Sequence, residues 1–386
     1  MGEVIRNILR RKLRTSLTVA GIVIGVFALT VMGALAEKLN VLVDGGNAYF
    51  ETRLFVSESG TGGFGGGGRP ISRQLADQIE AVDGVERASP VLQMLLDPAI
   101  RGGFDFPPIL TGIQPQTWYD PSTPLPIADG RLLNADDRGM VMIGADLAER
   151  YAVRVGDTLT IREVPFEVVA VLERTLTFPD KIAYAPLADV QHVYVDAAPG
   201  VIDFETDDLA TQIEVFIGDI SGADAVAERI EAEVAGVQVT TPAEVKDQLG
   251  QFSVVFNLII VGASVIAVIV GGLSVINTMV MTVSERVREI GIKKAVGART
   301  GAILREFLLE ATLLGALGGL IGLSAGSLLV VVLNAQTAAS GTTVFLVTPW
   351  LLARSFIFAT VLGALAGIYP AFRAARLDPV QSLRST

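Results

Sequence analysis

The stretch Ser274–Gly301, SVINTMVMTVSERVREIGIKKAVGARTG, constrains how the whole chain can fold. It begins inside a run that carries no charge from Val254 to Val283, and this run ends at Ser284. A chain that leaves a bilayer, forms one short charged helix and re-enters the bilayer has this pattern. Seven charged side chains follow the run within sixteen residues, before a second apolar run begins; they are Glu285, Arg286, Arg288, Glu289, Lys293, Lys294 and Arg299.

Composition favours a membrane protein that carries a separate water-facing part. The 386 residues are 51% hydrophobic, yet the formal net charge is −11. Both are expected when membrane spans and a soluble domain share one chain. The absence of cysteine excludes disulfides, and a single histidine argues against a histidine-based metal site or triad. We interpret the acid pairs at 136–137 and 207–208 as solvating, and expect no catalytic, cofactor or metal site and no nucleic-acid partner.

Four transmembrane helices are predicted from the uncharged runs. The first span and its stalk are expected at 15–46, ending near Gly45-Gly46, and a second stalk and span at 241–283. Thr241-Pro242-Ala243-Glu244 forms a capping box that predicts the start of the second helix. A helix from there to Val283 would be ~63 Å long at ~1.5 Å per residue, twice the ~30 Å of hydrocarbon, so part of it must lie outside the membrane. The third span is expected at 302–333 and the fourth at 350–370, joined by an outer loop at 334–349.

Residues 47–240 have the character of an α+β domain. The similar stretches LADQIEAVDGVERASP and VAERIEAEVAGVQVTTP each indicate a strand–helix–strand unit, and they flank an insertion at about 117–199. The insertion is predicted to be mainly β. The glycine-rich residues 60–68 are interpreted as a flexible loop, because no Gly-Lys-Ser/Thr follows them. The strands predicted inside the insertion are Met140–Ile143, Thr158–Ile161 and Phe166–Leu172, with turns at 156–157 and 164–165.

The distribution of lysine and arginine predicts the orientation. The segment up to Arg14 has five, the turn 284–306 has six and the tail after Pro370 has three. Residues 37–252 have fifteen, spread over more than 200 residues and set against thirty-five acids. Because short cytoplasmic segments are rich in Lys and Arg, we expect a cytoplasmic amphipathic segment at 1–14, a cytoplasmic turn and a cytoplasmic tail at 371–386. The chain would be a multi-pass protein of the plasma membrane.

Glycines at four-residue spacing predict close contacts between spans, either within the chain or between two chains. Glu310 is the acid that falls inside a span, and we interpret it as lying near the cytoplasmic end, close to Arg305, with its carboxylate reaching water. The candidate packing glycines are Gly21, Gly25, Gly318, Gly322, Gly326, Gly363 and Gly367.

Three stretches, SERVREIGIKKAVGART, FLLEATLLGALGGLIG and YPAFRAARLDPVQSLR, resemble the FtsX-type permease module of MacB-like macrolide-exporter and lipoprotein-releasing ABC transporters. RNILRRKLRTSLTVAGIVIGV is similar to the start of that family, and VGDTLTIREVPFEVVAVL resembles its extracytoplasmic core. The resemblance covers nearly the whole chain. It implies four spans per chain, outer domains on stalks, and a dimer formed with an identical or a different permease chain.

The resemblance also implies that residues 284–301 form a coupling helix that docks on an ABC ATP-binding subunit. The family's coupling motif corresponds to Glu285, Arg286, Arg288, Glu289, Ile290 and Gly291. Helical spacing adds Lys293, which can pair with Glu289, and Gly297, which can end the helix. The family's tail motif corresponds to Pro370, Arg373, Ala375, Arg376, Asp378 and Pro379.

The sequence therefore predicts an α-helical membrane protein with four transmembrane helices plus an extracytoplasmic α+β domain with a mainly β insertion, carried on helical stalks. It contains no GxxxxGK[ST] motif, so ATP and Mg²⁺ are expected on a separate ATP-binding subunit and the chain itself is not expected to be an enzyme. The expected function is a permease that passes movement from this subunit to the outer domain, in export or extraction of a substrate. The alternative is an FtsX-like regulator that signals to an extracytoplasmic protein. Substrate, direction and an outer partner stay open.

Overall fold

The computed structural model describes residues 12–50, 52–60, 69–98, 107–119, 125–197, 205–338 and 343–378. Most of the predicted N-terminal segment 1–14, the glycine-rich residues 61–68 and Pro379 lie outside these ranges. The chain divides into two compact units. The helical unit comprises Met1–Lys38, Val254–Gln336 and Phe345–Thr386, and the sheet unit comprises Leu39–Ser253 and Thr337–Val344.

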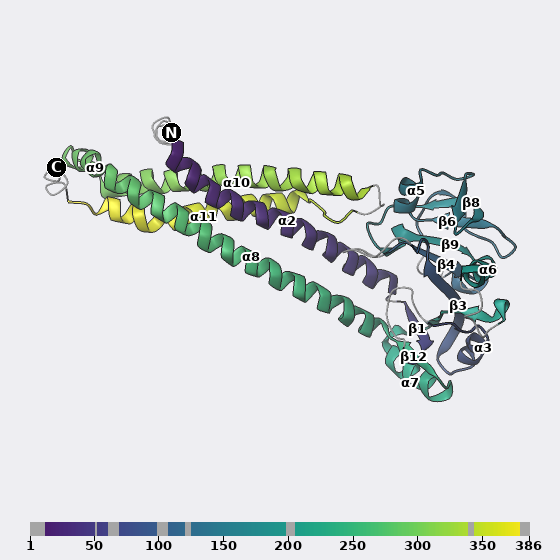
Figure 1. Ribbon diagram of the computed structural model, residues 1–386. Coiled ribbons are helices and arrows are strands. Elements are labelled where there is room, and N and C mark those ends of the chain that lie inside the picture. Colours follow the sequence, from purple (N-terminus) through teal and green to yellow (C-terminus); the bar gives the residue numbers. More distant parts are fainter. Residues whose placement is uncertain are drawn as a thin grey trace. The chain divides into compact units, whose positions relative to one another are not determined.

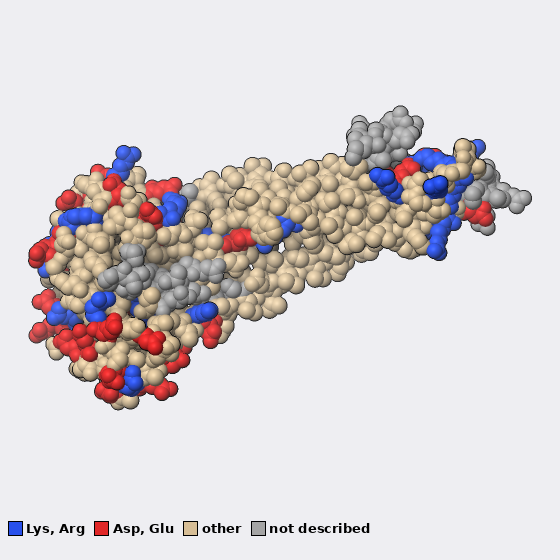
Figure 2. Space-filling model, turned by 180° about the vertical axis from the view of Figure 1, so that it is seen from behind, with Lys and Arg blue, Asp and Glu red and all other residues tan. Residues whose placement is uncertain are grey.

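Over the described residues, the helical unit contains all or part of four long helices and one short one (Figure 1). The helices are α2 (Lys12–Phe50), α8 (Pro242–Glu285), α9 (Val287–Ala295), α10 (Thr300–Ala338) and α11 (Pro349–Ala375). Four of them are long and apolar enough to cross a membrane, over Val19–Val43, Val254–Glu285, Thr300–Thr337 and Pro349–Ala375. Figure 2 shows the surface of this unit almost without charge along its length, with Lys and Arg gathered at the end that carries α9. Apolar side chains facing hydrocarbon account for this surface.

Four predicted helix ends differ from the observed ones. α10 continues to Ala338, past the predicted end at 333 and into the predicted outer loop. α2 continues through Gly45-Gly46 to Phe50. Glycine allows a helix to end, because it can adopt the left-handed conformation, but it does not force the helix to end. α8 reaches Glu285, past the predicted end at Val283. α11 continues five residues beyond Pro370, which lies inside the helix and not at its end. A proline costs one backbone hydrogen bond inside a helix, and membrane helices tolerate this where neighbours compensate.

The predicted capping box is present at the start of α8. The Thr241 backbone N–H donates to Glu244 Oε2 at 3.2 Å, and the Glu244 N–H donates to Thr241 Oγ1 at 3.3 Å. Both bonds satisfy N–H groups that have no partner within the helix. The same helix continues without a break into the second candidate span.

The sheet unit contains one long sheet in the order β12-β1-β11-β3-β4-β9-β6-β8-β5, with β7 paired to β8, and a small sheet of β10 and β2. The strands are β1 (Arg53–Glu58), β2 (Ile71–Ser72), β3 (Val85–Leu95), β4 (Ile109–Ile113), β5 (Ile127–Gly130), β6 (Met140–Ile143), β7 (Thr158–Ile161), β8 (Val164–Leu172), β9 (Ile182–Pro186), β10 (Leu209–Ala210), β11 (Gln212–Ile217) and β12 (Val237–Thr240). The helices are α3 (Leu75–Glu80), α4 (Pro115–Trp118), α5 (Ala145–Tyr151), α6 (Leu187–Ala197) and α7 (Ala223–Glu233), and the 3₁₀ turns are Phe178–Lys181, Thr206–Asp208 and Ile220–Gly222.

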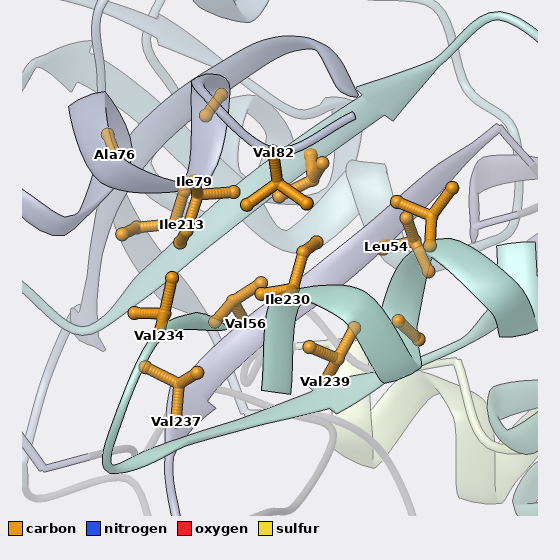
Figure 3. Packing of buried hydrophobic residues seen from close by; sticks show 14 of the residues in the cluster. Leu54, Val56, Ala76, Ile79, Val82, Ile213, Ile230, Val234, Val237 and Val239 are labelled. Carbon is orange, nitrogen blue, oxygen red and sulfur yellow. The ribbon is translucent and has the colours of Figure 1, made fainter. Parts of the chain in front are cut away.

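The two strand–helix–strand units predicted from the sequence interleave in one antiparallel sheet. β1 of the first unit lies between β11 and β12 of the second, and β11 pairs on its other side with β3. Figure 3 shows the apolar side chains of α3 and α7 meeting those of the strands, with Ile79 and Ile230 near the middle. Alternate residues of β1, such as Leu54 and Val56, point into this core.

Strand β3 passes from this core to a second apolar cluster. β3 pairs with β11 from Val85 to Val91 and with β4 from Leu92 to Leu95. It therefore contributes Ala88 to one apolar cluster and Leu92 to a second one. Pro90 lies just before the change of partner, where its missing N–H removes no bond to β4.

The insertion holds the predicted strands but also two helices. β6 and β7 have the predicted bounds, whereas α5 and α6 cover part of this region as well. The predicted turn at Val164-Pro165 is wrong: both residues belong to β8, and Ile161 pairs with Val164. The turn is Arg162-Glu163, with φ of 48° and 69°. Positive φ at both loop residues matches the twist of a two-residue hairpin, a geometry usually supplied by Asn or Gly.

Candidate functional site

The charged turn predicted at 284–301 forms α9, a helix of nine residues between two candidate spans. Arg286 separates α8 from α9: its φ of −104° and ψ of 13° depart from helical values, and its carbonyl accepts the Ile290 N–H at 2.9 Å. The chain therefore changes direction at one residue, and α9 follows α8 without a loop.

α9 ends where Gly297 was predicted to end it. Gly297 has φ of +101°, which side chains rarely adopt. Its N–H donates to the Lys294 carbonyl at 3.0 Å, and the Ala298 N–H donates to the Lys293 carbonyl at 2.9 Å. These two bonds form a Schellman motif, which satisfies carbonyls at the end of the helix.

One face of α9 is buried in the helical unit. Ile290 belongs to an apolar cluster with Ile303 and Phe307 of α10 and with Ala371 and Ala374 of α11. Gly291 is buried beside it. The Lys294 ammonium donates to the Leu377 carbonyl at 2.8 Å, which joins α9 to the segment after α11. Contacts with two further helices thus hold α9 in place.

The opposite face of α9 is exposed and partly apolar. We call the side chains of Arg288, Ile292, Ala295 and Val296 the exposed face of α9; their spacing of three and four residues places them on one stripe. Ile292 is 49% exposed and Val296 84% exposed, although both lie outside the candidate spans. Much of each of these two apolar side chains is therefore left uncovered by the part of the chain that the structure describes.

Charged groups hold the buried face of α9 against α10. Arg286 contacts Glu289 at 3.0 Å, Glu306 at 3.0 Å and Glu310 at 3.3 Å, and Lys293 contacts Glu306 at 2.9 Å and Glu289 at 3.2 Å. We refer to these five residues as the Arg286 cluster. The Arg286 guanidinium also lies 5.1 Å from the centre of the Phe307 ring, close enough for a cation–π contact.

The pKa values outside the spans follow from these pairs. Hydrogen bonds from Arg286, and less strongly from Lys293, lower the pKa of Glu289 to about 2 despite partial burial. Burial lowers the pKa of Lys293, but hydrogen bonds to Glu306 and Glu289 outweigh it and raise the pKa. The stabilisation from charged Glu289 is therefore complete above its unfolded-state pKa and is lost as the pH falls toward about 2. At neutral pH Glu289 and Lys293 are charged.

Sequence reasoning missed the role of Glu306 and assigned Glu310 a wrong environment. Glu310 is 6% exposed and pairs with Arg286, whereas the sequence placed it near Arg305 with its carboxylate in water. Arg305 itself is exposed. The signal was present in the four-residue spacing of Glu306 and Glu310, which puts both acids on one face of α10.

The predicted coupling residues separate into two groups. Ile290 and Gly291 are buried, and Arg286 is only 12% exposed on its side chain. Glu285, Arg288 and Glu289 are exposed. Of the tail motif, Pro370 and Ala375 are buried in α11, Arg376 caps that helix, and Arg373 and Asp378 are exposed.

All seven candidate packing glycines lie against another helix of the helical unit. Gly21 and Gly25 approach α8, whereas Gly318, Gly322 and Gly326 approach α2. Gly363 and Gly367 of α11 approach α10. Gly315 of α10, which the sequence pattern did not single out, meets Gly363 directly. The contacts of these glycines within the chain favour a role in packing inside one subunit.

The apolar helices and the mixed-sheet domain between the first and second of them define a class, the multi-pass membrane permeases with a large domain between two spans. A family model described as the MacB-like periplasmic core domain matches residues 15–233, and a second, described as the FtsX-like permease C-terminal, matches residues 261–379. The chain belongs to this MacB-like, FtsX-type family of ABC transporter permeases.

Three relatives illustrate the match. The macrolide export ATP-binding/permease protein MacB of Nitrobacter winogradskyi is 30% identical over 96% of this chain and 58% of its own length. The pyoverdine export ATP-binding/permease protein PvdT of Pseudomonas savastanoi pv. phaseolicola is 28% identical over 97% and 57%. The solved periplasmic region of MacB from Actinobacillus actinomycetemcomitans covers 52% of this chain and 92% of its own, at 16% identity and a TM-score of 0.36. The chain thus spans 58% and 57% of the length of the first two relatives.

Proposed function

We propose that the chain is the permease of an ABC exporter and that α9 is the helix on which an ATP-binding subunit acts. The observation that carries the proposal is the division of α9 into two faces. Its buried face packs against α10 and α11, whereas its exposed face presents Ile292 and Val296 outside the candidate spans. A short helix of this kind can bind a partner on one side and displace neighbouring helices on the other.

The partners proposed here follow from the family. An ATP-binding subunit would bind ATP and Mg²⁺, and a second permease chain would complete the transporter. The protein would lie in the plasma membrane. α9 and both termini would face the cytoplasm, and the sheet unit would lie on the outer side. The names of the relatives support export as the direction, for a substrate that we leave unassigned.

Movement is proposed to pass through the helices. α9 is continuous with α8 at Arg286 and is followed after a short turn by α10, so displacement of α9 acts on both spans. α8 extends from Glu285 back to Pro242, into the sheet unit, and α2 extends in the same way from the first span to Phe50. These two helices would carry the movement to the outer domain without a channel through the spans.

The docking part of the proposal is tested with Val296→Asp. A charge on the exposed face of α9 should weaken binding of the ATP-binding subunit on the order of tenfold or more, as loss of a central apolar contact does in other interfaces. The measurement is the amount of that subunit that co-purifies from detergent, together with ATPase activity. The matched control is Ile220→Asp, which places the same charge on a 43% exposed isoleucine of the sheet unit and should leave binding unchanged.

Unchanged binding with Val296→Asp would refute docking through this face. A chain that binds an extracytoplasmic protein through the sheet unit, with no effect on export, would favour the regulator described above.

A further inference from the structure

Arg286 occupies the one position where the direction of the chain changes between the second span and α9. Its backbone N–H still donates to Thr282 and Val283, each at 3.2 Å, so α8 is complete up to this residue. Its carbonyl begins α9 by accepting the Ile290 N–H. Any change in the angle between α8 and α9 must therefore alter the backbone of Arg286, and with it the direction of its side chain.

The side chain of Arg286 joins this position to the third span. Its Nη2 is 3.0 Å from Glu306 Oε1, and its Nη1 is 3.3 Å from Glu310 Oε2. The two acids are one turn apart on α10, and Phe307 lies beneath the guanidinium. A planar guanidinium with several N–H donors can bind two carboxylates at once in fixed geometry, which a lysine ammonium does much less well.

The cluster is too costly to be explained as incidental surface charge. Glu310 is 6% exposed inside a candidate span, where a carboxylate without its partner costs several kcal/mol. The cluster contains two cations, Arg286 and Lys293, and three acids, Glu289, Glu306 and Glu310. Apolar residues of similar size would avoid this cost but would not join α9 to α10 by directional bonds.

We infer that Arg286 is a positioning residue that fixes α9 to α10 through Glu306 and Glu310, so that displacement of α9 by its partner moves the third span. The inference rests on the proposed function and specifies how movement of α9 reaches the second and third spans. α8 moves because it follows directly on α9. α10 moves because the Arg286 guanidinium binds carboxylates on two successive turns of that helix. The ATP-binding subunit binds the exposed face of α9, and this binding does not involve the contacts of Arg286 with Glu306 and Glu310.

A purely structural role is separated from a positioning role by a neutral variant. Arg286→Met combined with Glu306→Gln and Glu310→Gln removes one positive and two negative charges, and leaves Lys293 paired with Glu289 at 3.2 Å. No unpaired buried charge is created, so the variant is expected to fold. Arg286→Lys is the second variant, because it keeps the charge and loses the two-armed geometry. Arg305→Met is the matched control, since it removes an exposed arginine from the same helix, one residue from Glu306.

The experiment follows two quantities in the complex with the ATP-binding subunit. Co-purification of that subunit reports docking. A spin label on Gln336→Cys reports movement at the far end of α10, as the change in its spectrum when ATP and vanadate are added. The chain contains no cysteine, so this position is the single labelled site.

The neutral variant should bind the subunit as the unmodified chain does and lose the nucleotide-dependent change at Gln336. Arg286→Lys should bind normally and show a reduced change, and Arg305→Met should keep both. The inference is overturned if the neutral variant or Arg286→Lys keeps the full change, or if the unmodified complex shows none. Failure of the unmodified chain to bind any ATP-binding subunit would instead refute the proposed function. If the neutral variant does not fold, Arg286→Lys decides.

Discussion

At the scale of single residues, contact between membrane helices depends on the absence of side chains. A Cβ on Gly363 would lie 2.7 Å from the Ala311 carbonyl oxygen and 2.8 Å from the Gly315 Cα, both backbone atoms of α10. Backbone cannot move aside as a flexible side chain can, so α10 and α11 would have to separate. Close approach of this kind is the usual basis of association between helices in lipid.

Gly363→Ala should therefore destabilise the helical unit by about 1–3 kcal/mol, the usual cost of overpacking. The matched control is Gly262→Ala in α8, where a Cβ would meet nothing within 4 Å. That change should be neutral or stabilising by up to about 1 kcal/mol, because alanine favours helix more than glycine does. Thermal unfolding in detergent measures both, and a Gly363→Ala protein as stable as the control would contradict the contact.

Some features that depend on neighbouring residues could be predicted from the sequence, whereas a contact between distant residues could not. Four residues in sequence were enough to predict the capping box at Thr241, because both of its bonds are local. The pairing of Arg286 with Glu310 joins residues 24 positions apart on different helices, and no local pattern states which faces meet. Arg162 and Glu163 gave no signal for a turn, because neither residue type favours positive φ.

At the scale of elements, the ends of α9 determine how closely it is joined to the neighbouring spans. Arg286 precedes the helix directly and Gly297 follows its end. No loop therefore separates α9 from α8, and only a short one separates it from α10. The long helices were predicted from uninterrupted apolar runs of about the right length. Their ends were less predictable, since Gly45, Gly46 and Pro370 are helix breakers in general but lie within helices here.

Gly297→Ala should loosen the end of α9 at a cost of about 1 kcal/mol, since alanine takes the left-handed conformation with difficulty. Hydrogen exchange at the amides of Gly297 and Ala298, which form the Schellman bonds, should become about fivefold faster, as expected for about 1 kcal/mol. The matched control is Gly301→Ala in the first turn of α10, where a Cβ meets nothing within 4 Å. Equal exchange in both variants would show that the motif does not stabilise α9.

At the scale of the whole molecule, the order of spans and domain defines two sides of a membrane. The main part of the sheet unit, Leu39–Ser253, lies in sequence between the first and second spans, and α9 lies between the second and third. With each span crossing once, these two segments must be on opposite sides. The excess of Lys and Arg around α9 favours the cytoplasm for that segment.

This topology predicts a clear labelling result, because the chain has no cysteine of its own. In intact cells a membrane-impermeant maleimide should label Glu228→Cys, an exposed position in α7, and should not label Arg299→Cys, an exposed position after α9. Both should react once the membrane is permeabilised, which serves as the control. The reverse pattern would place α9 outside, where no ATP-binding subunit could reach it.

The change of partner along β3 has a consequence for how sequences of this family can diverge. Both β3 and β10 contribute to the two apolar interiors, β3 through Ala88 and Leu92 and β10 through Ala210 and Leu209. A substitution in either strand can therefore disturb both interiors at once. Family members should therefore vary less at these four positions than at apolar positions that belong to one interior alone.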